Sequence, residues 1–167
     1  RKKILNIAER MLMQRGYHAF SYQHIAAELS IKPAAVHYHF RTKADLILAT
    51  IERYGRRFDD WEETVTDAGP SARLLAYVEV GQQMVVLGRV CALGMLNTQF
   101  ETVPEPVQHL ASTIQRRVLA FYSRALEEGR AAGEMRFEGS AEDTGAAISC
   151  ALIGAQQLAR AFGPTAY

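Results

Sequence analysis

Hydrophobic residues recur along most of the chain at the three-to-four-residue spacing of an amphipathic helix. No segment alternates apolar and polar residues with period two for long enough to predict a strand. The first helical stripe contains five residues: Ile4, Leu5, Ala8, Met11 and Leu12. Gly16 follows it where a glycine commonly ends a helix. The pattern therefore predicts an all-α protein.

Three further helices are expected in the first 65 residues. A short one covers residues 22–29 and is followed by a three-residue connection, Ser30-Ile31-Lys32. Another short helix starts at Pro33, which suits the first helical position, and runs to about residue 40. Thr42 then caps a longer helix that extends from 43 to about 65.

The rest of the chain predicts a larger helical body. Residues 67–71 (Asp-Ala-Gly-Pro-Ser) and 103–106 (Val-Pro-Glu-Pro) contain helix-breaking residues and mark breaks. Helices are expected at 72 to about 87, at 107 to about 132 and at 141–162, and an apolar segment at 90–100 separates the first two. Nothing repeats at a solenoid period.

Composition limits the class of protein. The chain has 167 residues, of which 49% are hydrophobic, so it has enough apolar material for a sizeable core. No apolar run approaches the roughly 20 residues of a membrane span, and no signal-peptide pattern opens the sequence. The two cysteines, Cys91 and Cys150, are too few for a disulfide framework and fit a reducing cytosol. We expect a cytoplasmic protein, with Cys150 in the core.

The net charge of +1 hides a division. Residues 1–57 carry 11 Lys and Arg against 4 Asp and Glu, which gives +7. Residues 58–167 carry 8 against 14, which gives −6. A basic N-terminal part on an acidic remainder predicts that only the former meets a polyanion.

The two short helices at 22–29 and 33–40, joined by three residues, form a helix-turn-helix pattern. The first would cross the phosphate backbone and the second would enter the major groove. Small residues at the start of the second helix (Pro33, Ala34 and Ala35) allow close approach to bases. The hydrogen-bond donors around it are Lys32, His37, Tyr38, Thr42 and Lys43.

The segment 4–51 resembles the DNA-binding head of TetR-family transcriptional regulators. The motifs that carry the resemblance are Arg15-Gly16-Tyr17, Ile25-Ala26, Leu29, Val36-His37-Tyr38-His39-Phe40 and Thr42-Lys43-Ala44-Asp45-Leu46. The resemblance implies phosphate contacts from Ser21, Tyr22, Gln23, Thr42 and Lys43, and groove contacts from residues 32–38. It also implies two domains, a helix-turn-helix domain at 1–45 and an effector-binding and dimerisation domain at 46–167.

A DNA-binding unit this small is expected to bind DNA as a homodimer. In the family that the head resembles, the last two long helices pair with those of a second copy. The candidates for that seam are Gln115, Val118, Tyr122, Gln156, Gln157 and Arg160. Alternatively, either helix packs only on the core of its own chain and makes no dimer contact.

The resemblance further implies an effector pocket in the body. Its candidate lining residues are mainly bulky or soft: Phe58, Trp61, Met84, Leu87, Cys91, Met95, Gln99, Phe100 and Phe121. Residues of this kind at helical spacing are also ordinary core residues. As a set they indicate a moderately large apolar or aromatic ligand.

Cys91 supports an alternative, a regulator that senses electrophiles or oxidants through a thiolate favoured by Arg89. A buried, inert cysteine is the other interpretation. His37 and His39 are two residues apart on a helix and therefore diverge, so we predict no metal and no cofactor.

These observations predict a ligand-responsive transcriptional regulator, most simply a repressor that its effector releases from the operator. The alternatives are the thiol sensor and a small-molecule-binding helical module without DNA function. The sequence contains no G-x-S-x-G, H-E-x-x-H, Walker or dinucleotide signature, so we do not expect an enzyme.

Overall fold

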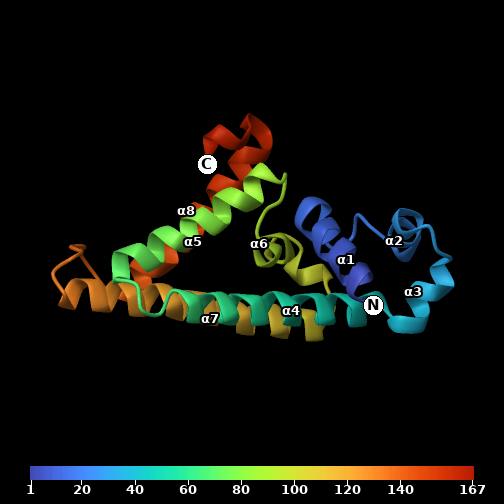
Figure 1. Ribbon diagram of the computed structural model, residues 1–167, viewed down its shortest axis with the longest axis horizontal. Helices are drawn as coiled ribbons and strands as arrows, with labels where there is room; N and C mark the ends of the chain where they lie inside the picture. The colour runs from blue at the N-terminus through green and yellow to red at the C-terminus, as the bar shows by residue number, and fades with distance from the viewer. The chain divides into compact units, whose positions relative to one another are not determined.

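The computed structural model describes the backbone of residues 1–167 and every side chain except that of Ala166 (Figure 1). The helices are α1 (Lys2–Arg15), α2 (Tyr22–Leu29), α3 (Pro33–His39), α4 (Lys43–Thr64), α5 (Pro70–Val86), α6 (Ala92–Asn97), α7 (Glu105–Ala131) and α8 (Ala141–Phe162), with short 3₁₀ turns η1 (Phe100–Thr102) and η2 (Pro164–Ala166). The residues described contain no strand. The expected all-α class is confirmed.

Three helix ends differ from the expectation. Helix α5 begins at Pro70 and α7 at Glu105, both earlier than predicted, because a proline in the first helical turn loses no intrahelical hydrogen bond. Helix α3 ends at His39, since Phe40 has an extended backbone (φ −141°, ψ 113°). The prolines that suggested breaks therefore mark helix starts.

The chain divides into two compact units. The head unit consists of residues 1–57 and 92–112, and the body unit of residues 58–91 and 113–167. Helices α4 and α7 each contribute residues to both units. The functional division expected at residue 45 stays a prediction.

The core of the head unit comes from one face of each helix. Ala8, Leu12, Ile25, Val36 and Leu46 are 0% exposed and fix α1, α2, α3 and α4 around a common interior. Helix α6 packs with α1 and is buried at five of its six positions. The head unit is thus larger than the first four helices.

A buried carboxylate joins α1 to α4. Glu9 is 8% exposed, and its carboxylate pairs with Arg53, at 2.8 Å, and with Arg57. The Arg53 guanidinium also donates to Asn6 Oδ1 at 2.7 Å. Two cations thus balance one nearly buried anion.

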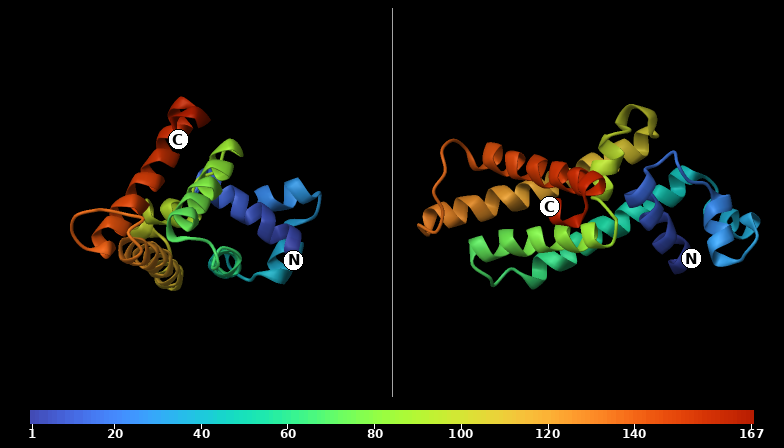
Figure 2. Two further views of the ribbon diagram at one scale, coloured as in Figure 1. Left: turned by 60° about the vertical axis from the view of Figure 1, so that its left-hand side comes forward. Right: turned by 90° about the horizontal axis from the view of Figure 1, so that it is seen from above.

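The body unit contains α5 and α8, which contact each other and run side by side in the left view of Figure 2. Gly145 of α8 lies against α7, where an added Cβ would be 2.9 Å from the Cβ of Tyr122. The most deeply buried large side chains of this unit are Phe121 and Tyr122.

The prediction that Cys150 lies in the core is wrong, because its side chain is exposed. It directly follows the buried Ser149 in α8. Within the part of the chain whose side chains are placed, no helix is long and apolar enough to cross a membrane.

Candidate functional site

Helix α3 presents nearly all of its side chains to solvent. Of its seven residues only Val36 is buried, and Phe40 directly after it is also buried. Lys32, Pro33, Ala34, Ala35 and His37 are exposed, and Tyr38 is 86% exposed. A helix anchored by one or two apolar residues, with small residues at its start, has the shape that major-groove entry requires.

Local hydrogen bonds set the two short helices at their angle. Ser21 caps α2 in a capping box in which the Ser21 N–H donates to His24 Nδ1 at 3.0 Å. Ser30 ends α2 in the left-handed conformation (φ 54°), and the Ile31 N–H reaches back to the Ala26 carbonyl at 3.0 Å. The three-residue turn predicted from the sequence is therefore a closed helix end.

Tyr22 faces inward although it was predicted to contact DNA. It is 8% exposed, and its hydroxyl lies 3.0 Å from the carbonyl oxygen of Phe40 and 2.5 Å from that of Thr42. Its ring meets that of His37 edge-on at 4.5 Å. Burial, with smaller contributions from Asp45 and Tyr17, raises the pKa of Tyr22 to about 12. Tyr22 is placed to hold α3 and the start of α4 in position.

Lys43 is also engaged within the head unit. Its ammonium donates to the Phe20 carbonyl and lies over the rings of Tyr17, at 4.8 Å, and Phe20, at 4.4 Å. Burial lowers the pKa of Lys43. Thr42 and Asp45 cap α4 reciprocally, with the Thr42 N–H 2.9 Å from the Asp45 carboxylate.

A polar hollow of about 520 Å³ gathers most of the predicted DNA-binding residues. Those that line it are Ser21, Tyr22, Gln23, Pro33, His37, Thr42 and Lys43. Lys32, Ala34, Ala35 and Tyr38 lie outside it on the exposed part of the turn and α3. Arg41 also lines the hollow and was missed, although its position beside the Thr42 cap was a signal for it. A hollow with basic, hydroxyl and amide donors suits a phosphate group.

Comparison with known proteins identifies the fold and the head. Residues 4–50 match the family model of bacterial regulatory proteins of the tetR family. A TetR-family transcriptional regulator from Agrobacterium tumefaciens superposes with a TM-score of 0.92 at 25% identity, over 97% of this chain and 87% of that one. The head of the chain is therefore that of the TetR family, and the chain has the fold of solved TetR-family regulators.

Other solved structures share the fold. A TetR regulator of Legionella pneumophila gives a TM-score of 0.85 at 24% identity, over 96% of this chain and 87% of that one. NemR of Escherichia coli in its reduced form gives a TM-score of 0.78 at 21% identity, over 98% of this chain and 90% of that one. No curated protein matches the chain. With this head and this fold the chain is a DNA-binding regulator and not an enzyme.

In the body unit, aromatic rings form one cluster. Phe58, Trp61 and Phe121, predicted to line an effector pocket, meet Tyr77 and Tyr122 with centroid distances between 5.2 and 6.0 Å. Tyr77 was not predicted, and its only signal is its place on the apolar stripe of α5. Burial is the main cause that raises the pKa of Tyr77 and of Tyr122.

The other predicted effector residues are dispersed. Met84 is half-buried, and Cys91 is half-buried with its backbone N–H on Gln156 Oε1 at 2.6 Å. Met95, Gln99 and Phe100 belong to the head unit. There the Gln99 side chain accepts from the Tyr17 N–H at 2.7 Å and fills the space beside Gly16, a glycine with φ +83°. Gln99 thus serves a packing role.

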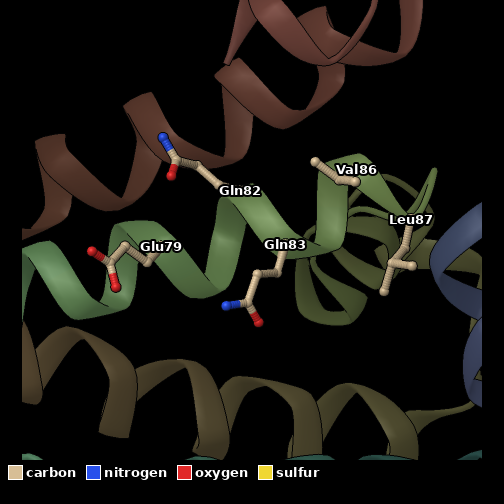
Figure 3. Close-up of a pocket in the computed structure, with 5 residues that line it drawn as sticks. All are labelled: Glu79, Gln82, Gln83, Val86 and Leu87. Atoms are coloured by element: carbon tan, nitrogen blue, oxygen red, sulfur yellow. The ribbon is translucent and has the colours of Figure 1, made fainter.

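Leu87 lines an open hollow of about 610 Å³ along α5, together with Glu79, Gln82, Gln83 and Val86 (Figure 3). Gln82 and Gln83 point to opposite sides of the helix in that view. Val86 and Leu87 are 72% and 59% exposed. This is a surface hollow with one helix for its lining.

The predicted dimer residues differ in exposure. Val118, Tyr122 and Gln156 are buried within their own chain, Gln115 and Gln157 are half-buried, and Arg160 is exposed. In a dimer interface on these helices, the buried side chains would lie beneath the contacting surface. The exposed large apolar residues of α8 are Leu158 (55%) and Phe162 (73%), neither of which was predicted. Among the side chains described, no group of three or more His, Cys, Asp or Glu is arranged to hold a metal.

Proposed function

We propose that this TetR-family regulator is a homodimeric repressor that binds its operator through α3 and is released by a small apolar or aromatic effector. The observation that carries the DNA-binding part is the exposure of α3, in which only Val36 is buried. A helix with so little packing of its own is available for a groove. The positive charge of residues 1–57 supports the same orientation.

We divide the proposed DNA-binding residues by role. Lys32, Pro33, Ala34, Ala35 and Tyr38 would meet base edges. Ser21, Gln23, His37, Arg41 and Thr42 would meet phosphates, because they line or border the polar hollow. Tyr22 and Lys43 would position these groups, since their polar ends already bond to carbonyl oxygens.

A DNA titration at several salt concentrations tests this division. The probe is duplex DNA from upstream of the protein's own gene, with unrelated duplex DNA of the same length beside it. Tyr38→Ala should reduce the preference for the upstream DNA by about tenfold. Arg41→Ala should weaken binding to both duplexes alike and reduce the salt slope by about 1.

Lys43→Ala should also weaken binding to both duplexes alike. Arg136→Ala in the body unit is the matched control. Wild-type protein that binds neither duplex at low salt would instead favour the helical module without DNA function. Wild-type affinity of the Arg41→Ala variant at every salt concentration would contradict its assigned phosphate contact, and wild-type affinity of the Lys43→Ala variant would contradict its positioning role.

The proposed dimer uses α7 and α8, with Gln115, Gln157 and Arg160 at the surface and Val118, Tyr122 and Gln156 beneath it. The exposed Leu158 and Phe162 support an apolar seam on α8. Leu158→Asp should convert the dimer to a monomer in sedimentation equilibrium. A monomeric wild-type protein would disprove the seam.

Release by an effector requires that DNA and effector bind with reciprocal effects. Helices α4 and α7, which contribute to both units, are the continuous elements available to link them. Effector affinity should therefore fall in the presence of operator DNA by the same factor that effector lowers DNA affinity. Equal effector affinity with and without DNA would exclude the allosteric mechanism.

The thiol-sensing alternative depends on Cys91, which is half-buried beside Tyr77 and Tyr122. Alkylation followed by mass spectrometry tests it, with the exposed Cys150 as an internal control. A sensor thiolate would react faster than Cys150 despite its lower exposure. Slower reaction at Cys91 would leave it a core cysteine.

A further inference from the structure

Tyr167 inserts its phenol into the body unit beside α5 and α8. Its hydroxyl lies 3.4 Å from the Val78 carbonyl oxygen and hydrogen-bonds with the Gln156 side chain. An added Cβ at Gly81 would overlap that hydroxyl and would lie 2.9 Å from the ring carbon that bears it. The absence of a side chain at Gly81 is therefore what admits the phenol.

The groups around this phenol form a built polar recess. Gln156 is 5% exposed, and its amide bridges the Cys91 backbone N–H and the Tyr167 hydroxyl. Burial raises the pKa of Tyr77, Tyr122 and Tyr167, and each phenol also lies within electrostatic reach of Cys91. A neutral hydroxyl on an aromatic ring is therefore the group that this recess accommodates.

A hollow of about 390 Å³ shares Gln156 with this recess. Its lining includes Arg89 and Arg160, and also Pro164 in the segment that carries Tyr167. The Arg89 Nε is buried and has no hydrogen-bond partner among the residues described. A buried guanidinium nitrogen without a partner is costly, and an anionic oxygen is the acceptor that satisfies it best.

We propose that Tyr167 acts as an internal ligand in the effector site, and that the effector is an aromatic carboxylate with a ring hydroxyl. The effector's hydroxyl replaces that of Tyr167 at Gln156, and its carboxylate pairs with Arg89 and Arg160. The effector class thus rests on the proposed effector-responsive function. Because Tyr167 is tethered, it competes at a constant effective concentration and lowers the apparent affinity of the effector.

Trp61 offers a direct readout of this site. It is the single tryptophan of the chain, and its ring lies 5.2 Å from that of Tyr77. The probe is 4-hydroxybenzoate, titrated into full-length protein and followed by Trp61 emission and by calorimetry. Phenol and benzoate are the ligand controls, and each should bind about tenfold more weakly or worse, since each lacks one charged or polar contact.

The variants separate the two contacts. Tyr167→Ala should bind 4-hydroxybenzoate about tenfold more tightly than wild type, because the internal competitor is removed. Arg89→Gln should bind it about tenfold more weakly through loss of a charge-assisted hydrogen bond. Gly81→Ala should also weaken binding, since a methyl group occupies the place of the hydroxyl. Tyr38→Ala in the head unit is the control and should leave the affinity unchanged.

Failure of this proposal is distinct from failure of the proposed function. No 4-hydroxybenzoate binding, equal affinity for phenol, or unchanged affinity in Tyr167→Ala would overturn it even if operator binding were normal. Tyr167→Phe keeps the ring and loses the hydroxyl, so its affinity for 4-hydroxybenzoate should lie between those of wild type and Tyr167→Ala. Thermal unfolding of this variant serves as the folding check. Tight binding without any change in DNA affinity would support the site and overturn effector-controlled release instead.

Discussion

The head and body units use their polar side chains in opposite ways. In the head unit, the side chains proposed to contact DNA are exposed on α3 and around a polar hollow. In the body unit, the polar side chains nearest the proposed effector site are buried, as for Tyr122 and Gln156, or half-buried, as for Tyr77. A surface that reads a rigid duplex can be displayed, whereas a small ligand has to be enclosed.

The difference extends to what stabilises each unit. The head unit joins α1 to α4 through the buried Glu9 carboxylate and its two arginines. The body unit has five aromatic rings in mutual contact at its interior. Removing one ring from the body unit and removing the ionic contact from the head unit should therefore lower the free energy of unfolding by different amounts. The two substitutions should also change different spectroscopic signals.

The largest effect is expected in the ring cluster. Phe121 is 1% exposed and contacts four other rings, so Phe121→Ala should lower the free energy of unfolding by about 4 kcal/mol. Urea unfolding followed by circular dichroism measures it. Phe137→Ala, whose ring is half-buried beneath Arg130, should cost no more than about 1 kcal/mol. Equal losses would show that the cluster does not dominate the body unit.

The second effect concerns the ionic contact of the head unit. Glu9→Ala leaves Arg53 and Arg57 without their shared anion and should cost about 3 kcal/mol in the same assay. The control is Glu52→Ala, because Glu52 pairs with Arg56 at 3.9 Å on an exposed surface and should cost no more than about 0.5 kcal/mol. A Glu9 variant as mild as this control would contradict the buried role.

The head could be predicted in detail because its motif residues have strong local preferences. Pro33 starts a helix and Thr42 caps one, and both effects act within a few residues of sequence. The inward orientation of Tyr22 and Lys43 could not be predicted this way. Their partners are backbone carbonyls about 20 residues away, and any residue type supplies a carbonyl.

The body could be predicted only as helices. Apolar periodicity marks Phe58, Trp61 and Phe121 as buried, but a ligand-lining ring and a core ring have the same pattern. Gln156 illustrates the limit. Its polarity suggested a surface seam, whereas the fold brings it under Cys91 and beside Tyr167, contacts that depend on how α5 and α8 pack.

A third effect, smaller than the first two, concerns Gln99 in the head unit. Its side-chain oxygen accepts from the Tyr17 N–H at 2.7 Å, and Gln99→Ala leaves that amide without an acceptor. The expected cost is about 1.5 kcal/mol, with about tenfold faster hydrogen exchange at the Tyr17 amide. Asn97→Ala, at an exposed position of α6, is the control. Unchanged exchange at Tyr17 would exclude the contact.

The smallest effect is a pH dependence that both units share through buried phenols. The pKa of Tyr22 is raised to about 12, so the folded chain holds this proton while the unfolded chain releases it near pH 10. Between these values the unfolded state binds fewer protons, and stability falls as the pH rises. Tyr22→Phe should therefore reduce the loss of unfolding free energy between pH 9 and 11 by about 1 kcal/mol. Tyr122→Phe should act in the same direction in the body unit, because burial also raises its pKa. A profile as steep in Tyr22→Phe and Tyr122→Phe as in the wild type would show that these two phenols titrate alike in the folded and unfolded chains.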